Sequence, residues 1–347
     1  MHIFLTGATG FIGQALTKAM LQRGWSITAL VRKPGSPQAQ VLSAMGARLV
    51  SGDVTERESV RAAMMGADIV VHNAGQLEYG VDSAGEKRMR AVNVDGVENV
   101  LGLARELGIS RTIYVSTIQA FGRTGSLQRD ETFTRNTACQ TVYEQTKTDA
   151  HEIALQYQQR GLPLIIVCPH QVVGPNDHSV MGFFQRLYVN GLMPPLAWSP
   201  KSTVCCVEVN DLAEGISLAA EKGRTGETYI LCGDPQNFLE IFKYWQQKPG
   251  RFIPRLYLPA RIAEVMFAPM EPIMRMFGLP AFFSRETVRV VAANWNFSNK
   301  KAKEELGWTH RSFEALWFGT LDGEISLLAR RKGQGLIERL KPLDRVD

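Results

Sequence analysis

The chain has 347 residues, of which 45% are hydrophobic and 21% charged, and its formal net charge is +5. This length corresponds to about two domains, whose cores need neither disulfides nor metals to be stable. The composition excludes collagen-like, low-complexity and wholly disordered chains. The small positive charge falls well short of a nucleic-acid-binding signature, so no nucleic-acid partner is expected.

The cysteines and histidines argue against a metal site. No two cysteines form a C-x-x-C pair, and the six histidines show no metal-ligand spacing, so no metal is expected. The odd number of cysteines does not suit a disulfide framework. The cysteine content therefore favours a reducing compartment. A strand-like run already begins at residue 2, which leaves no room for a signal peptide, and no apolar run reaches roughly 20 residues. We expect a cytoplasmic protein.

Apolar strand-like runs alternate with amphipathic helical patterns through the first half of the chain. The predicted strands are His2–Leu5, Ser26–Val31, Ala47–Ser51, Ile69–His72, Thr112–Ser116 and Leu164–Cys168, and the clearest helices are Gln14–Arg23, Val97–Leu107 and Tyr143–Gln159. This alternation predicts an α/β fold, a Rossmann-type doubly wound parallel sheet with helices on both faces. We assign residues 1–173 to this cofactor-binding domain.

Periodicity becomes less regular after residue 174, which predicts a smaller C-terminal substrate-binding domain over residues 174–347. Within it, a helix over Asp211–Glu221 and a strand over Thr228–Leu231 suggest that residues 203–232 return to the main sheet. Cys205 and Cys206 lie in a predicted strand, where alternation should bury one of them. The stretch 251–283 is basic and rich in Met and Phe.

A glycine-rich turn follows the first predicted strand. Gly7, Gly10 and Gly13 recur at three-residue spacing between that strand and the next helix. Such glycines permit a tight turn, close approach of a pyrophosphate, and close helix–sheet packing, while the helix N-terminus offers N–H groups to the phosphates. The pattern predicts a dinucleotide site, with contacts that include Thr9, Phe11 and Ile12.

The second predicted strand ends without an acidic residue. Arg32 and Lys33 stand where a carboxylate would select the ribose 2′-hydroxyl of NAD(H), whereas basic residues accommodate a 2′-phosphate. We therefore expect NADP(H), with NAD(H) as the alternative, and Arg32 as the main phosphate contact. A solvated strand end with no role in binding is the competing interpretation.

A tyrosine and a lysine four residues apart suggest acid–base chemistry. Tyr143 and Lys147 project from one face of a predicted helix, where the ammonium can stabilise a phenolate. Such a pair is common by accident. Tyr114-Val115-Ser116-Thr117, at the end of a predicted strand, strengthens the hypothesis, because doubly wound folds bind ligands at strand carboxyl ends.

Several ordered motifs together give the chain a resemblance to the extended short-chain dehydrogenase/reductase family, over roughly residues 1–317. They are Thr6-Gly7-Ala8-Thr9-Gly10-Phe11-Ile12-Gly13, Gly52-Asp53-Val54, His72-Asn73-Ala74-Gly75, Asn93-Val94-Asp95-Gly96, Val115-Ser116-Thr117, Tyr143-x-x-x-Lys147, Pro169-x-x-Val172-x-Gly174-Pro175, Val209-Asn210-Asp211-Leu212-Ala213 and Lys301 to Trp308. In character the chain is most similar to dihydroflavonol-reductase and 3β-hydroxysteroid-dehydrogenase members.

The resemblance implies a role for each matching position. Tyr143 becomes the general acid/base, Lys147 tunes it and binds the nicotinamide ribose, and Thr117 holds the reacting oxygen. The remaining implied cofactor contacts are Asp53 and Val54 at the adenine, Asn73, Ala74 and Asn93 nearby, Pro169, and the backbone of Val172 at the carboxamide. Helices Val97–Leu107 and Tyr143–Gln159 commonly form a dimer interface in this family, so a homodimer is expected.

The chain departs from the sugar-nucleotide members of the family. Cys168 stands before Pro169, where those members commonly have arginine. The lid region offers apolar residues instead, which favours an apolar ligand, although core packing also explains many of them. These residues are Trp198, Phe252, Tyr257, Met266, Phe267, Met270, Met274, Met276, Phe277, Phe282 and Phe283. Gln119, His170 and Trp198 are the expected substrate contacts.

The leading hypothesis is an NADP(H)-dependent oxidoreductase that reduces a ketone or aldehyde of a fairly apolar molecule, or catalyses the reverse. A sugar-nucleotide epimerase or dehydratase with tightly held NAD(P) is the first alternative, and a non-catalytic NADP-sensing protein is the second. Arg251, Arg255, Arg261 and Arg275, interspersed in the Met- and Phe-rich stretch, also suggest a peripheral contact with a membrane surface.

Overall fold

The computed structural model describes residues 1–247, 252–276, 282–331 and 333–343. Arg251 and Phe277, two residues of the Met- and Phe-rich stretch, lie outside these residues, as does the side chain of Arg275. Among the described residues, no helix combines the length and apolar character needed to cross a bilayer.

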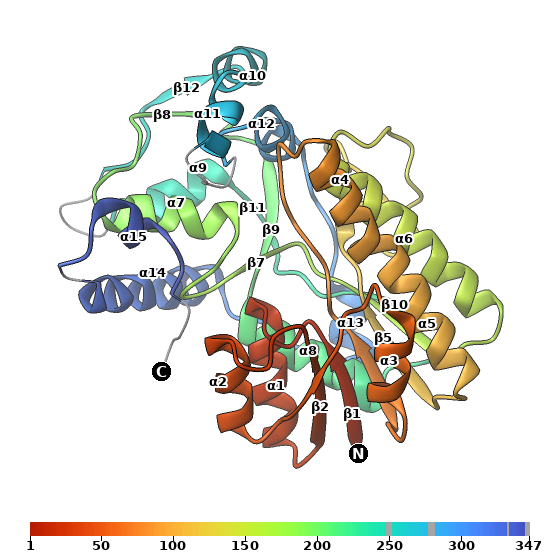
Figure 1. Ribbon diagram of the computed structural model, residues 1–347. Coiled ribbons are helices and arrows are strands. Elements are labelled where there is room, and N and C mark those ends of the chain that lie inside the picture. Colours follow the sequence, from red (N-terminus) through yellow and green to blue (C-terminus); the bar gives the residue numbers. More distant parts are fainter. Residues whose placement is uncertain (248–251, 277–281, 332, 344–347) are drawn as a thin grey trace.

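Seven parallel strands form the central sheet, in the spatial order β10-β6-β5-β4-β1-β2-β3 (Figure 1). They are β1 (His2–Thr6), β2 (Ser26–Val31), β3 (Arg48–Ser51), β4 (Ile69–His72), β5 (Arg111–Val115), β6 (Leu164–Cys168) and β10 (Thr228–Ile230). Strand order reverses at β1, which pairs with both β2 and β4. The expected Rossmann-type sheet is confirmed, and its reversal point is where such folds bind ligands.

Helices cover both faces of this sheet, which explains the nearly continuous apolar sequences of its strands. One face carries α1 (Phe11–Gln22), α2 (Pro37–Met45), α8 (Val209–Lys222) and α13 (Lys300–Leu306), and the other carries α3 (Arg57–Met64), α5 (Gly96–Glu106) and α6 (Val142–Gln159), with α4 (Ser83–Arg90) against α6. In β1, Ile3 and Leu5 face the first layer and Phe4 faces the second, and all three are fully buried.

The rest of the chain forms two small sheets and a second group of helices. The strands are β7 (Gln171–Val173), β9 (Thr203–Glu208) and β11 (Pro235–Asn237) in one sheet, and β8 (Leu196–Trp198) and β12 (Leu256–Leu258) in the other. The helices are α7 (Val180–Val189), α9 (Phe238–Trp245), α10 (Ala260–Phe267), α11 (Met270–Met276), α12 (Arg285–Ala292), α14 (Phe313–Arg330) and α15 (Leu336–Leu340). We call α10, α11 and α12 the lid helices.

Segment 203–232 contributes to two sheets. β10 joins the central sheet beside β6 and α8 packs on α1, whereas β9 lies in the three-stranded sheet. Cys205 and Cys206 in β9 are both fully buried, so the expectation that only one would be buried was wrong. The reason is that β9 is covered on both faces: Cys205 joins the core under α5 and α6, and Cys206 joins the core of the second half.

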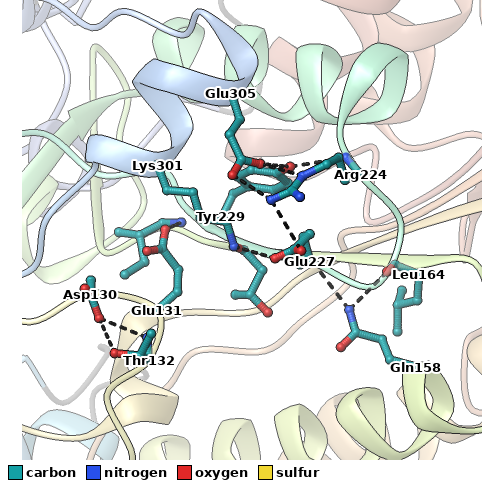
Figure 2. A network of polar contacts seen from close by, with 12 residues as sticks. Asp130, Glu131, Thr132, Gln158, Leu164, Arg224, Glu227, Tyr229, Lys301 and Glu305 are labelled. Atoms are coloured by element: carbon teal, nitrogen blue, oxygen red, sulfur yellow. Dashed lines mark hydrogen bonds and ion pairs between the residues drawn. The ribbon is translucent and has the colours of Figure 1, made fainter.

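A polar network fastens helix α13 to the edge strand β10 (Figure 2). Lys301 reaches a carboxylate oxygen of Glu227 at 2.7 Å and the carbonyl of Thr228 at 2.8 Å. Glu305 accepts hydrogen bonds from Arg224 at 2.7 and 3.0 Å and from the Tyr229 hydroxyl at 2.8 Å. These contacts fix a late segment of the chain on the cofactor-binding half and cover an otherwise open sheet edge.

Candidate active site

The glycine turn after β1 has the geometry of a phosphate cradle. Gly7 has φ +70°, and a Cβ at this position would lie 2.7 Å from the backbone nitrogen of Ala74. A Cβ on Gly13 would lie 2.1 Å from the carbonyl oxygen of Gly7, so only glycine allows this turn to close. Gly10 caps α1 without a side-chain hydrogen bond. Thr9 lies in the turn, and Phe11 and Ile12 begin the helix. The first N–H groups of a helix have no partner within it, which makes this end suited to an anion.

The other predicted cofactor contacts follow the carboxyl ends of neighbouring strands. Arg32 and Lys33 come directly after β2, are exposed, and form no ion pair with any described carboxylate. Asp53 and Val54 follow β3, and Asp53 accepts hydrogen bonds from the Thr55 backbone and hydroxyl, each at 2.9 Å. The carboxyl ends of parallel strands lie along the same edge of the sheet. The residues that follow β2 and β3 are therefore near one another without needing direct contacts between their side chains.

Residues after β4 are held by hydrogen bonds to the glycine turn and to helix α6. Asn73 donates its side-chain amide to the Gly7 carbonyl at 3.3 Å, and the Ala74 N–H donates to the Thr6 hydroxyl at 3.1 Å. Asn93 lies in a π-helical turn, Ala91–Asp95, where it exchanges hydrogen bonds with the Gln76 backbone at 2.7 and 2.9 Å and donates to Thr146 at 3.1 Å. Asn93 thus braces the segment after β4 against α6.

Thr117, Tyr143 and Lys147 come together beneath the lid helices. Thr117 caps the 3₁₀ turn Ile118–Phe121, directly after β5, and Tyr143 and Lys147 lie in the first two turns of α6. Burial raises the pKa of Tyr143 to about 12, and a hydrogen bond with Thr117 opposes that rise. The Tyr143 hydroxyl is therefore protonated near neutral pH and is able to donate a proton.

Lys147 is buried against the carboxyl end of β5. Its ammonium donates to the Tyr114 hydroxyl and to the Val115 carbonyl, both at 3.1 Å, and lies 4.9 Å from the Tyr114 ring centroid. Burial lowers the pKa of Lys147 to about 8. An ammonium has three donors, so one N–H is left beyond these two partners within the described residues. That donor is available to a ligand hydroxyl.

An ion pair between Arg135 and Glu144 joins the Thr117 turn to the Tyr143 helix. Arg135 contacts Glu144 at 2.7 Å, donates to the Ala120 carbonyl at 3.2 Å, and also hydrogen-bonds the Gln119 carbonyl. Glu144 is nearly fully buried next to Tyr143. Sequence reasoning missed this pair, because a single arginine in a loop carries no signal for a contact nine residues away.

A cavity of about 270 Å³ adjoins this group and lies under the lid helices. The expected substrate residues Gln119, His170 and Trp198 all line it. Tyr79 lines it as well, and its ring packs edge-on against that of Tyr143, with the ring centroids 6.3 Å apart. Lid residues Met266, Phe267, Met270 and Phe283 also line it, whereas Phe252 and Met276 point to solvent. Among the described lining residues none is Lys, Arg, Asp or Glu.

The polar groups of this cavity are few and neutral. Burial lowers the pKa of His170 to about 3, and its Nδ1 accepts the Cys205 N–H at 3.2 Å. Gln119 Oε1 and Trp198 Nε1 are buried and have no hydrogen-bond partner within the described residues. An apolar ligand with one or two polar groups matches such a surface.

The residues at the sheet edge fit a nicotinamide dinucleotide. Side chains are excluded at Gly7 and Gly13, and the first N–H groups of α1 have no partner within the helix. Within the described residues, Lys147 keeps a donor beside β5. Pro169 follows β6, and Val172 lies in β7 at the same edge. Within the described residues, no three His, Cys, Asp or Glu side chains are grouped to hold a metal.

Comparison with known proteins agrees with this geometry. Residues 3–232 match the model of the NAD dependent epimerase/dehydratase family. The chain is 30% identical to the 4-hydroxy-2-methyl-3-oxo-4-farnesyl-3,4-dihydroquinoline-1-oxide ketoreductase of Stigmatella aurantiaca, over 90% of this chain and 92% of that protein. It is 27% identical to sterol demethylase protein B of Methylococcus capsulatus, over 91% and 95% of the two chains.

Solved structures show the same fold. The crystal structure of gox2253 has a TM-score of 0.77 at 29% identity, covering 96% of this chain and 98% of that one. The UDP-glucose 4-epimerase of Thermotoga maritima has a TM-score of 0.76 at 19% identity, covering 94% and 100%, which speaks for the fold alone. The chain belongs to the NAD-dependent epimerase/dehydratase family and is an NAD(P)-dependent enzyme of the extended short-chain dehydrogenase/reductase type.

Proposed function

We propose that the protein is an NADP(H)-dependent oxidoreductase that reduces a ketone or aldehyde carbonyl of a predominantly apolar small molecule, or catalyses the reverse. The observation that carries this proposal is the uncharged apolar cavity beside Tyr143. The ketoreductase relative supports it, because that protein's name describes a farnesylated substrate with an oxo group.

The site supports proton transfer to a substrate oxygen. A nicotinamide cofactor held at the sheet edge would supply or accept the hydride. Tyr143, kept neutral by burial, donates the proton to the oxygen in the reducing direction, and Thr117 holds that oxygen by a hydrogen bond. Lys147 provides positive charge that stabilises the phenolate left behind, and its remaining donor binds the nicotinamide ribose.

The preference for NADP(H) is supported by Arg32 and Lys33. Both side chains are exposed at the end of β2, so they are free to bind a 2′-phosphate without breaking an ion pair among the described residues. An unpaired guanidinium binds phosphate in a bidentate manner at little reorganisation cost.

A sugar-nucleotide epimerase or dehydratase is the main alternative. The diphosphate bridge of a nucleotide sugar carries two negative charges, and the cavity offers no described lysine or arginine to neutralise them. A non-catalytic NADP sensor is the second alternative. The presence of the buried Thr117 and Lys147 together with the partly buried Tyr143 argues against it.

One assay separates these functions. Purified protein is mixed with NADPH and, in turn, apolar ketones, aldehydes, steroids and nucleotide sugars, and NADPH oxidation is followed by absorbance. Net oxidation with an apolar carbonyl, abolished in Tyr143→Phe while NADPH affinity is kept, supports the proposal. Interconversion of a nucleotide sugar without net oxidation supports the epimerase. Activity retained in Tyr143→Phe overturns the catalytic assignment.

We also propose a homodimer through α5 and α6, as the family resemblance implies. Sedimentation equilibrium should give twice the chain mass, and Leu155→Arg, on the exposed side of α6, should shift the protein towards the monomer. A monomer for the unaltered chain contradicts this proposal.

A further inference from the structure

A single carboxylate from the lid contacts two backbone segments beside the predicted acid–base tyrosine. Glu286 Oε2 accepts the N–H of Gly80 at 2.7 Å, and Glu286 Oε1 accepts the N–H of Val142 at 3.0 Å. These partners lie 206 and 144 residues away in the chain. The two oxygens of one side chain therefore hold together three parts of the fold.

Each partner is next to a tyrosine of the site. Val142 is the first residue of α6 and directly precedes Tyr143. Gly80, which has φ +62°, directly follows Tyr79, a cavity-lining residue whose ring is in edge contact with Tyr143. Glu286 thus fixes the backbone beside both rings.

The contact with Glu286 satisfies one of the backbone N–H groups at the start of α6 that have no partner within the helix. The first N–H groups of a helix have no partner within the helix. Thr141 satisfies that of Glu144 at 2.9 Å, and Glu286 satisfies that of Val142. A carboxylate at a helix N-terminus also gains from the helix dipole. Burial raises the pKa of Glu286, and the hydrogen bonds from the Gly80 and Val142 N–H groups oppose that rise.

Helix α12, which carries Glu286, is itself a wall of the substrate cavity. Thr287, Val290 and Val291 of the same helix line that cavity. Ser284 caps the helix by accepting the N–H of Thr287 at 3.1 Å, and Glu271 accepts the N–H of Arg285 at 2.8 Å, so its N-terminal turn is well anchored. The helix that would touch the substrate is therefore the one that contacts the backbone of Val142, directly before Tyr143.

We propose that Glu286 is a positioning residue, which sets the placement of Tyr143 from the lid through the backbones of Val142 and Gly80. This inference rests on the proposed reductase function, because it assigns Glu286 an effect on the proton-transfer step. A misplacement of about 1 Å at a reacting group can lower the rate about 100-fold, so two lost hydrogen bonds are enough to matter.

The test compares Glu286→Ala and Glu286→Gln with Glu271→Gln. Glu286→Ala removes both acceptors, whereas Glu286→Gln is nearly isosteric and keeps one, which guards against a variant that does not fold. Glu271→Gln is the matched control, since Glu271 also accepts a backbone N–H in the lid, that of Arg285.

Kinetics and hydrogen exchange are then measured on the full chain. We expect Glu286→Ala to lower kcat about 50-fold and Glu286→Gln about 10-fold, with the Kd for NADPH within about twofold of the unaltered chain. A rise in KM alone, or an equal loss in Glu271→Gln, indicates a merely structural role and overturns the proposal.

Amide hydrogen exchange, read by mass spectrometry on peptides that cover residues 73–82 and 139–147, needs no activity. Faster exchange in both peptides of Glu286→Ala, but not in those of Glu271→Gln, supports the contact. This result would hold even if no substrate were turned over, and in that case only the proposed reductase function would fail. Unchanged exchange overturns the contact itself, and faster exchange with an unchanged kcat overturns its effect on Tyr143.

Discussion

Lys147 shows how burial tunes a single residue towards a function. Its ammonium is buried against Tyr114 and Val115, and this burial lowers its pKa to about 8, so the charge that supports Tyr143 is lost within an accessible pH range. Several strand ends position the residues of the site. The positive charge that supports Tyr143 at neutral pH comes from Lys147.

The first prediction concerns the pH dependence of carbonyl reduction. Lys147 is protonated below pH 8 and neutral above it, so kcat/KM should be level up to about pH 8 and then fall about tenfold per pH unit. Tyr143, with a pKa of about 12, should not add a break in this range. Lys147→Met should be slow at every pH and should lack the break. A level profile up to pH 10 in the unaltered enzyme would contradict this role.

The second prediction concerns cofactor choice at Arg32. Arg32→Ala should raise KM for NADPH about 30-fold, which corresponds to about 2 kcal/mol for a charge-assisted contact, and leave KM for NADH unchanged. Arg48→Ala is the matched control, because Arg48 is also exposed but lies at the amino end of β3, whereas Arg32 follows the carboxyl end of β2. Equal use of the two cofactors by the unaltered enzyme would disprove the preference.

Among the elements, α10 has an unusual distribution of apolar residues. Ala263 and Phe267 are buried, yet Ile262, Val265 and Met266 are all exposed, with Val265 at 74%. Such spacing makes the outer face of the helix apolar as well. The nearby Arg255 and Arg261 are exposed and form no ion pair among the described residues, so the uncompensated charge of this surface is positive.

The third prediction is that this face of α10 binds an anionic membrane surface. The full chain should sediment with vesicles of phosphatidylcholine and phosphatidylglycerol, and Val265→Glu should weaken binding about tenfold, because burial of an apolar side chain contributes about 1.5 kcal/mol or more. Met65→Glu, at a residue 64% exposed on the cofactor-binding half, is the control. Absence of sedimentation would indicate that this face does not bind a membrane. A loss of self-association in Val265→Glu would indicate instead that the face is a protein interface.

For the whole molecule, three buried histidines couple stability to pH. Burial lowers the pKa values of His72 and His170 to about 3 and that of His151 to about 4. All three are therefore neutral when folded, whereas the unfolded chain binds protons on them below the ordinary value of 6.5. Unfolding takes up protons on these histidines, so they lower the free energy of unfolding as pH falls from about 6.5 towards 4. Asp177, whose pKa burial raises to about 6, opposes this fall, because its folded carboxyl binds a proton before the unfolded one does.

The fourth prediction gives this effect a size. Each histidine lowers the free energy of unfolding by up to about 1.4 kcal/mol per pH unit across that window. Urea unfolding at a series of pH values should show this contribution, and His151→Gln, which can keep a hydrogen bond to Ser116, should reduce the slope by up to about 1.4 kcal/mol per pH unit. The same slope in His151→Gln and in the unaltered chain would rule out a buried neutral state of His151.

Much of the fold follows from local sequence. The predicted strands Ser26–Val31, Ile69–His72 and Leu164–Cys168 coincide with β2, β4 and β6, because β-branched apolar runs between turns have few alternatives in a doubly wound fold. The glycine turn was equally readable, since φ and the space for a Cβ are properties of a few adjacent residues. The burial of both Cys205 and Cys206 was not, because it depends on which segments cover β9.

The sequence by itself determined the doubly wound fold, the family, and the gathering of Tyr143, Lys147 and Thr117 at one sheet edge. Helix and strand periodicities and short motifs encode these features, because each motif involves residues near one another in the chain and a doubly wound fold brings the ends of its strands together. Only the tertiary structure decided which lid residues line the cavity, which face solvent, and that Glu286 contacts the backbone before Tyr143. Those contacts join segments up to 206 residues apart, and no local pattern specifies a pairing between such segments.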